Sequence, residues 1–167
     1  MDKLWAPWRL KYILEDTALG KNKVCIFCFY PVDQSEKDKE NLLLYRGKLS
    51  FVIMNRYPYN TGHIMIAPYR HVAGFHELSK EELEDITLLM KTCINALKDA
   101  FSPQGFNIGI NQGKVAGAGY EEHIHVHIVP RWDGDTSFMP VISDTKVLPE
   151  SLSDTYDKIK ENLHEAY

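Results

Sequence analysis

The chain has 167 residues, of which 44% are hydrophobic and 25% are charged, and its formal net charge is −4. This balance predicts one globular domain, residues 1–167, with a core of its own. The negative charge argues against general affinity for nucleic acid or an anionic membrane, and no apolar run reaches the roughly 18 residues of a spanning helix. The basic, tryptophan-containing start MDKLWAPWRLKYI does not resemble a signal peptide, so we expect a cytoplasmic protein.

Three cysteines form an odd set, and two of them make the motif Cys25-x-x-Cys28. In a reducing compartment this spacing indicates metal or redox chemistry rather than a structural disulfide. A thioredoxin-like motif would open a helix, whereas here Pro31 and the polar run 33–41 follow, which predict a mobile surface loop. We therefore interpret the pair as half of a zinc site, and unligated core thiols are the alternative.

The next elements in chain order are strands. Residues 42–47 and 48–55 predict two strands joined by a turn, and a third apolar run covers 63–72. Beyond the long helix, residues 106–110 and 124–129 predict two more strands.

The long helix begins after Ser79, where Ser79-x-x-Glu82 forms a capping box, and it ends at Ser102-Pro103. Its buried stripe is predicted to hold Leu83, Ile86, Met90, Cys93, Leu97 and Phe101. A weaker helical pattern follows Leu148. Strands, a long helix, more strands and a terminal helix predict an α+β fold.

Residues 123–131 read HIHVHIVPR, with a histidine at every second position of the first five. Because side chains alternate along a strand, His123, His125 and His127 should share one face, about 7 Å apart, while the apolar residues between them pack on the core. Two chemistries fit: a catalytic zinc with an open position, or a nucleophilic histidine whose neighbours hold an anionic substrate. The small-residue loop 116–119 favours a phosphate, because backbone N–H groups can approach one closely there.

The segment 123–129 resembles the signature of the histidine triad family, His-φ-His-φ-His-φ-φ with φ apolar. The resemblance runs from Cys25 to about Trp132 and includes CIFC, the segment NRYPYNTGHIMIAP and the Asn-x-Gly loop. WAPWR near the start and VPRWDGD-x-x-FMPV after the triad are similar to the diadenosine tetraphosphate phosphorylase branch. The resemblance implies an antiparallel sheet of about five strands, N- and C-terminal extensions, and a homodimer joined through the long helix and a sheet edge.

The resemblance also implies a role for each matching residue. His125 would attack the α-phosphorus of a nucleotide, and His127 and His63 would contact the phosphate. The substrate-binding residues that it implies are Asn55 for the ribose, Ile53 beside the base, and Asn111 with the N–H groups of Gly117 to Gly119 for the phosphate. From its residue type, Trp132 could stack on a base or cap the pocket. A core position for Ile53 and a strand-end cover for Trp132 are the alternatives.

For the metal, the resemblance implies a closed structural Cys₂His₂ zinc site made by Cys25, Cys28, His71 and His123. One departure concerns Gly119, which stands where many relatives carry a glutamine or serine that touches the phosphates. The acceptor, water or inorganic phosphate, therefore stays open.

The sequence thus predicts a nucleotidyltransferase or phosphohydrolase that acts on an adenine nucleotide or dinucleoside polyphosphate, above all diadenosine tetraphosphate. One alternative is a phosphoramidate or mononucleotide hydrolase that uses the same histidine. The others are a nucleotide-binding module with little turnover and a zinc hydrolase with its metal on the triad.

Overall fold

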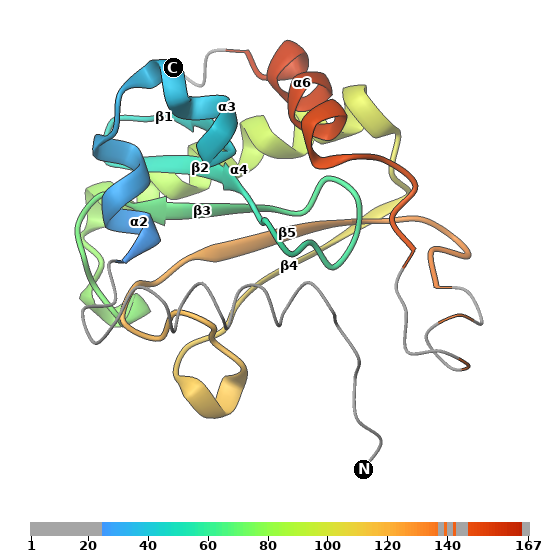
Figure 1. Cartoon of the computed structure of the whole chain (residues 1–167). Coiled ribbons are helices and arrows are strands. Elements are labelled where there is room, and N and C mark those ends of the chain that lie inside the picture. The colour runs from blue at the N-terminus through green and yellow to red at the C-terminus, as the bar shows by residue number, and fades with distance from the viewer. Residues whose placement is uncertain (1–24, 137–138, 140–141, 143–146, 165–167) are drawn as a thin grey trace, which may run out of the picture.

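Five antiparallel strands form one sheet in the computed structural model, which describes residues 25–136, 139, 142 and 147–164 (Figure 1). The strands are β1 (Leu43–Arg46), β2 (Ser50–Met54), β3 (Ile64–Pro68), β4 (Gly105–Ile110) and β5 (Val126–Arg131). Their order is β1-β2-β3-β5-β4, so β5 lies between β3 and the edge strand β4. The predicted five-stranded α+β architecture is confirmed.

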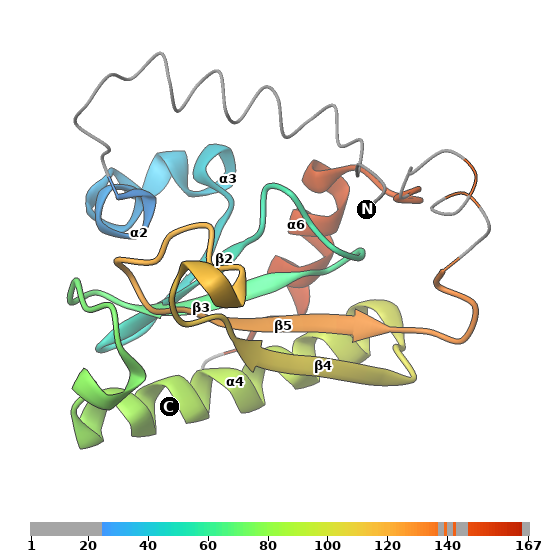
Figure 2. The same cartoon turned by 90° about the horizontal axis from the view of Figure 1, so that it is seen from below.

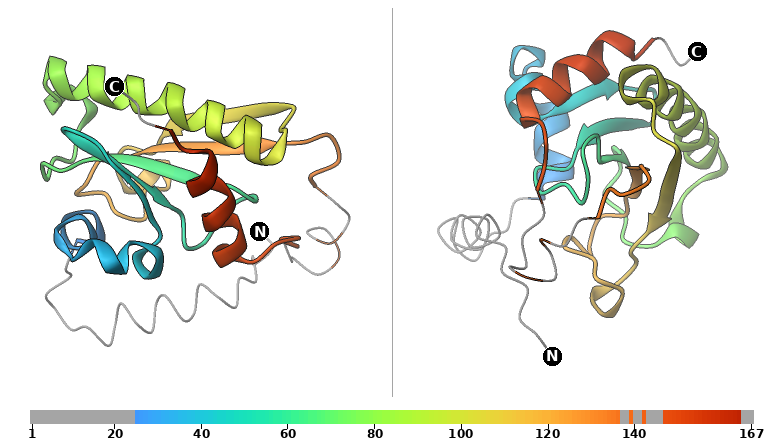
Figure 3. Two further views of the ribbon diagram at one scale, coloured as in Figure 1. Left: turned by 90° about the horizontal axis from the view of Figure 1, so that it is seen from above. Right: turned by 90° about the vertical axis from the view of Figure 1, so that its right-hand side faces the viewer.

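Helices cover both faces of this sheet. Helix α4 (Lys80–Phe101) packs on β2, β3 and β5, and α6 (Leu152–Asn162) packs on α4 and β1 (Figure 3). The short helices α2 (Ile26–Phe29) and α3 (Asp38–Asn41) lie across the sheet from α4 (Figure 2). Turns of 3₁₀ helix cover Tyr30–Val32, Ser35–Lys37, Phe75–Glu77 and Lys114–Ala116.

Helix α4 begins and ends where its sequence predicts. The Ser79 hydroxyl accepts a hydrogen bond from the Glu82 N–H (3.2 Å), and the Glu82 carboxylate accepts one from the Ser79 N–H (2.8 Å). The helix ends at Ser102, which adopts the left-handed conformation with φ 47°. The predicted core position of Cys93 is confirmed, since this thiol is 0% exposed.

The sequence analysis predicted a mobile surface loop over residues 33–41, and this prediction is wrong. The segment instead folds into the 3₁₀ turn Ser35–Lys37 and α3. Arg46 in β1 holds it: the guanidinium donates to both carboxylate oxygens of Asp38 (2.6 and 3.2 Å) and to the carbonyl oxygens of Pro31 and Asp33. A cation 8 or more residues away therefore orders a stretch that shows no apolar pattern.

The WAPWR motif, and all of FMPV except Met139, lie outside the described residues. Within the described part of the chain, no helix has both the length and the apolar character needed to cross a membrane.

Candidate active site

The histidine segment enters the sheet later than predicted. β5 begins at Val126, so His123 and His125 precede the ladder and only His127 lies in it. Ile124 still donates its N–H to the Val72 carbonyl (2.7 Å), which holds the segment in place. The imidazoles of His125 and His127 lie 4.8 Å apart between ring centroids, so these two rings share one face as expected.

His125 has one nitrogen engaged and one available. Its Nδ1 lies 2.8 Å from the carbonyl oxygen of His123. A carbonyl can only accept, so Nδ1 carries the proton and the lone pair remains on Nε2. Burial lowers the pKa of His125, opposed by this hydrogen bond, which favours the neutral ring at physiological pH. The Phe27 ring of α2 stacks on the imidazole at 4.7 Å, which fixes its plane. The geometry therefore presents a neutral imidazole nitrogen suited to nucleophilic attack.

His63 and His127 form a directed pair beside it. The Tyr59 N–H donates to Nδ1 of His63 (3.1 Å), so the His63 proton resides on Nε2. That Nε2 lies 2.9 Å from Nδ1 of His127, which therefore accepts and keeps its own proton on Nε2. Burial, then His125, lowers the pKa of His127 to about 4. His127 is thus a neutral donor at neutral pH.

The pKa of His63 gives the apo fold a pH dependence. Burial, then His127 and His125, lowers this pKa to about 3. A histidine of the unfolded chain has a pKa of about 6.5. Below that pH, His63 is protonated in the unfolded chain but remains neutral in the folded chain. We expect His63 to cost the fold about 2 kcal/mol as the pH falls from about 6.5 to about 5.

The measurement is the free energy of unfolding in chelator at about pH 7 and about pH 5. His63→Gln cannot titrate, so its stability should fall by about 2 kcal/mol less than that of the parent across this interval. Equal falls in the two proteins would mean that His63 is charged in the folded state.

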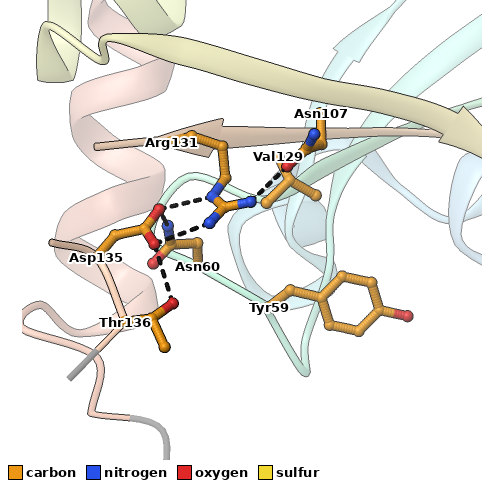
Figure 4. A pocket seen from close by; sticks show the side chains of 7 residues that line it. All are labelled: Tyr59, Asn60, Asn107, Val129, Arg131, Asp135 and Thr136. Carbon is orange, nitrogen blue, oxygen red and sulfur yellow. Dashed lines mark hydrogen bonds and ion pairs between the residues drawn. The ribbon is translucent and has the colours of Figure 1, made fainter. Parts of the chain in front are cut away.

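Two adjoining pockets lie beside the histidines. The first, of ≈ 200 Å³, is lined by His127 and Asn111 together with Tyr59, Asn107, Ile108, Gly109 and Val129. The second, of ≈ 280 Å³, shares Tyr59, Asn107 and Val129 with it and extends toward Arg131 (Figure 4). The structure therefore brings the predicted residues His63, His125, His127 and Asn111 together.

Three other predicted residues are placed less directly. The Asn55 side-chain oxygen accepts from the Tyr57 N–H (2.9 Å), and the backbone N–H of Asn55 donates to the His63 carbonyl (3.0 Å), which puts Asn55 beside the His63–His127 pair. Ile53 is 2% exposed and belongs to the core, as its alternative interpretation has it. The Trp132 indole donates to the Phe101 carbonyl (3.3 Å) at the end of α4, which matches a strand-end cover.

The loop before the triad differs from the phosphate cradle that we expected. The N–H groups of Gly117 and Ala118 donate to the carbonyls of Lys114 (3.0 Å) and Gly113 (3.4 Å), so the loop itself uses them. Gly117 has φ +89°, a conformation that favours glycine at the end of the 3₁₀ turn. Gly119 has no heavy atom within 4 Å of a Cβ built on it. The 3₁₀ turn Lys114–Ala116 and the left-handed residue that ends it therefore account for the small residues of this loop without a bound phosphate.

Four residues from three distant segments form a candidate metal centre: Cys25, Cys28, His71 and His123, whose ligand atoms all lie within 4.8 Å of one another. Nδ1 of His123 lies 3.4 and 3.5 Å from the two sulfurs, and Nδ1 of His71 lies 3.2 Å from the Cys28 sulfur. Tetrahedral zinc with thiolate and imidazole ligands separates neighbouring ligand atoms by roughly 3.3–3.8 Å. The donor set and its spacing fit such an ion.

The protein also orients one of these ligands. Nε2 of His123 lies 2.9 Å from the Pro68 carbonyl, so it carries the proton and leaves Nδ1 to face the sulfurs. Burial lowers the pKa of His123 to about 4, which keeps it in the neutral form that binds metal. Burial, then Cys25, raises the pKa of Cys28 to about 11 in the metal-free protein.

The sequence analysis missed three residues that shape the site: Phe27, Tyr59 and Asn60. Phe27 packs on His125 from between the cysteines, and Tyr59 contacts His63 at 4.6 Å between ring centroids. Asn60 is 7% exposed and donates to the Pro130 carbonyl (3.0 Å) and to Asp135 (2.9 Å). Their only signal was position, inside CIFC and two to three residues before Gly62-His63, since nothing in an aromatic or amide residue by itself indicates a site.

Comparisons with known proteins agree with this geometry. The HIT domain model matches residues 36–134. The chain is 37% identical over 157 residues to AP-4-A phosphorylase from Mycobacterium tuberculosis, an alignment that covers 93% of this chain and 80% of that protein.

Solved structures give the same result for the fold. A hypothetical histidine triad nucleotide-binding protein from Sulfolobus tokodaii superposes with a TM-score of 0.64 at 25% identity, covering 83% of this chain and 91% of that one. Diadenosine triphosphate hydrolase from Plasmodium falciparum superposes with a TM-score of 0.61 at 27% identity, covering 90% and 93%. Because the family model spans more than half of the residues and the histidine signature is complete, this chain belongs to the HIT domain family.

Proposed function

We propose that this chain cleaves diadenosine tetraphosphate through a nucleotidyl-histidine intermediate on His125, with inorganic phosphate as the acceptor. The chain is an enzyme of the nucleotide hydrolase and transferase class to which its named relatives belong. The observation that carries the mechanism is the hydrogen bond from Nδ1 of His125 to the His123 carbonyl, which leaves Nε2 as the nucleophile. The choice of substrate and acceptor is supported by the similarity to AP-4-A phosphorylase.

In the first step, Nε2 of His125 attacks the α-phosphorus and forms an N–P bond. The bond from that phosphorus to the bridging oxygen breaks, and ATP leaves with the electron pair. His127 donates its Nε2 proton in a hydrogen bond to a phosphoryl oxygen, and His63 holds His127 in this tautomer. Asn111, which lines the same pocket as His127, supplies a further amide near these oxygens.

In the second step, an oxygen of inorganic phosphate attacks the adenylyl phosphorus. The N–P bond breaks, the electron pair returns to Nε2 of His125, and the product is ADP. Imidazole suits both steps, because it attacks as the neutral ring and leaves readily while it bears positive charge.

We propose zinc as the ion of the group formed by Cys25, Cys28, His71 and His123. Four protein ligands leave no open position, so bound zinc would supply stability rather than Lewis-acid chemistry. Its place in this mechanism is to anchor the segment that leads into His125.

We also propose that the chain forms a homodimer and that it is cytoplasmic. β4 is an edge strand of the sheet, and Ile108 on it is 42% exposed. Leu88 on α4 is 44% exposed. Pairing of the two β4 edges would cover unpaired backbone groups, which edge strands otherwise expose.

The test is product analysis of diadenosine tetraphosphate incubated with and without inorganic phosphate. We expect ADP and ATP in equal amounts when phosphate is present. AMP and ATP without phosphate would make the enzyme a hydrolase and contradict the proposed acceptor. Absence of turnover, together with cleavage of an adenosine phosphoramidate, would contradict the proposed substrate.

A further inference from the structure

A groove continues from His127 toward the far end of β5. Side chains alternate along a strand, so His127, Val129 and Arg131 share the face that carries the catalytic residues. Opposite them on β4 stand Gly109, Asn107 and Gly105. A Cβ built on either glycine would meet no heavy atom within 4 Å. The two glycines therefore leave this part of the sheet surface open.

The far end of the groove carries Arg131, whose positive charge is neutralised by an ion pair with Asp135. The Arg131 guanidinium donates to both carboxylate oxygens of Asp135 (2.6 and 2.9 Å) and to the Asn107 side-chain oxygen (2.6 Å). The Asp135 side chain is 7% exposed, while that of Arg131 is 46% exposed. Arg131 also holds down the pKa of the Asp135 carboxyl, so this pair stays ionised and internally neutral. Such a wall offers hydrogen bonds and a planar surface to a neutral polar group more than it offers charge to a phosphate.

Tyr59 forms the opposite wall of the groove. Its ring packs on His63 at 4.6 Å between centroids, and its backbone N–H is bonded to the same imidazole, which fixes the residue. The side chain is nevertheless 57% exposed. Figure 4 shows the ring across the pocket from Val129, Asn107 and the Arg131–Asp135 pair. A rigid, open aromatic face opposite amide and guanidinium groups suits a heteroaromatic base.

We infer that the pocket between Tyr59 and Arg131 is a subsite for the second nucleoside of the substrate, whose base stacks on Tyr59. This inference rests on the proposed function, because only a dinucleoside polyphosphate carries a nucleoside on its leaving group. The ring centroid of Tyr59 lies 6.0 Å from that of His127, so the subsite begins beside the reacting phosphorus. From there it extends to Arg131, which stands four residues, about 13 Å, beyond His127 along the strand.

The experiment compares two substrates that share the reacting adenylate. Diadenosine tetraphosphate carries the second nucleoside, and adenosine 5′-tetraphosphate lacks it. For the parent and for Tyr59→Ala, Tyr59→Leu and Tyr59→Phe, kcat/KM is measured on both substrates with inorganic phosphate. A leucine side chain still packs against His63 but has no aromatic face. If the alanine variant unfolds, the leucine variant therefore still tests whether the base stacks on Tyr59.

We expect the parent to prefer the dinucleotide by about tenfold or more, the size of one base stacked on an aromatic side chain. Tyr59→Ala and Tyr59→Leu should lose about tenfold of this preference, and Tyr59→Phe should retain it. An equal loss on both substrates would show that Tyr59 acts only through His63, and would overturn the subsite. Absence of turnover of both substrates by the parent would instead overturn the proposed function, which is thereby distinguished from a failure of the subsite alone.

Discussion

His125→Ala is expected to lower kcat by a factor of about 10⁴ or more, the size of loss seen when a catalytic nucleophile is removed. The physical reason is that no other described nitrogen of the site is both unprotonated and unengaged. Nε2 of His63 and of His127 carry protons in the hydrogen-bonded chain that starts at the Tyr59 N–H. The measurement is single-turnover cleavage of diadenosine tetraphosphate, with acid-quenched samples examined for a covalent adenylyl adduct.

Two controls separate chemistry from folding. His125→Asn retains an amide that can still donate to the His123 carbonyl but carries no nucleophilic nitrogen, so it should bind nucleotide and remain inactive. His76→Ala removes an exposed histidine outside the site and should leave kcat unchanged. Turnover near the parent level in either His125 variant would refute the nucleophile assignment.

Cys25→Ala is expected to remove the bound zinc and to lower the free energy of unfolding by about 4 kcal/mol, the contribution of a ligand present at about a thousand times its Kd. We also expect the kcat of this variant to fall. Phe27 lies between the two cysteines, contacts His123 in a tilted arrangement (5.2 Å) and stacks on His125 (4.7 Å), so release of the metal frees the ring that orients the nucleophile. The measurements are metal content by mass spectrometry and unfolding in denaturant, each with and without chelator.

Cys93→Ala is the matched control, because it deletes a thiol of α4 that is buried in the hydrophobic core and is no part of the metal group. It should keep its zinc and respond to chelator as the parent does, although the cavity lowers its overall stability. If Cys25→Ala and the parent respond alike to chelator, the zinc site is refuted. If the parent binds metal and loses it only when His125 and His127 are both replaced, the metal lies on the triad instead.

The fold class follows from the sequence because its signals are local. The capping box at Ser79, the Ser102-Pro103 stop and the apolar stripe between them each depend on residues a few positions apart, and α4 forms where they indicate. The strands likewise follow from apolar runs and turns. The structure of the segment 33–41 could not be predicted in this way, because it is held by Arg46, whose bonds to Asp33 and Asp38 form only once β1 is in the sheet.

The sequence by itself narrowed the chemistry. The alternating histidines left a catalytic zinc and a nucleophilic histidine open, and the resemblance to the histidine triad signature implied nucleotidyl transfer with the metal ligands in a separate group. Only the tertiary structure decided how each imidazole is used. The tautomer of each imidazole depends on its hydrogen-bond partner. The partner is the Pro68 carbonyl for His123, the backbone carbonyl of His123 for His125, and the His63 ring for His127. A hydrogen bond is a relation between positions in space, so the roles of three chemically identical side chains can diverge only after the sheet has assembled around them.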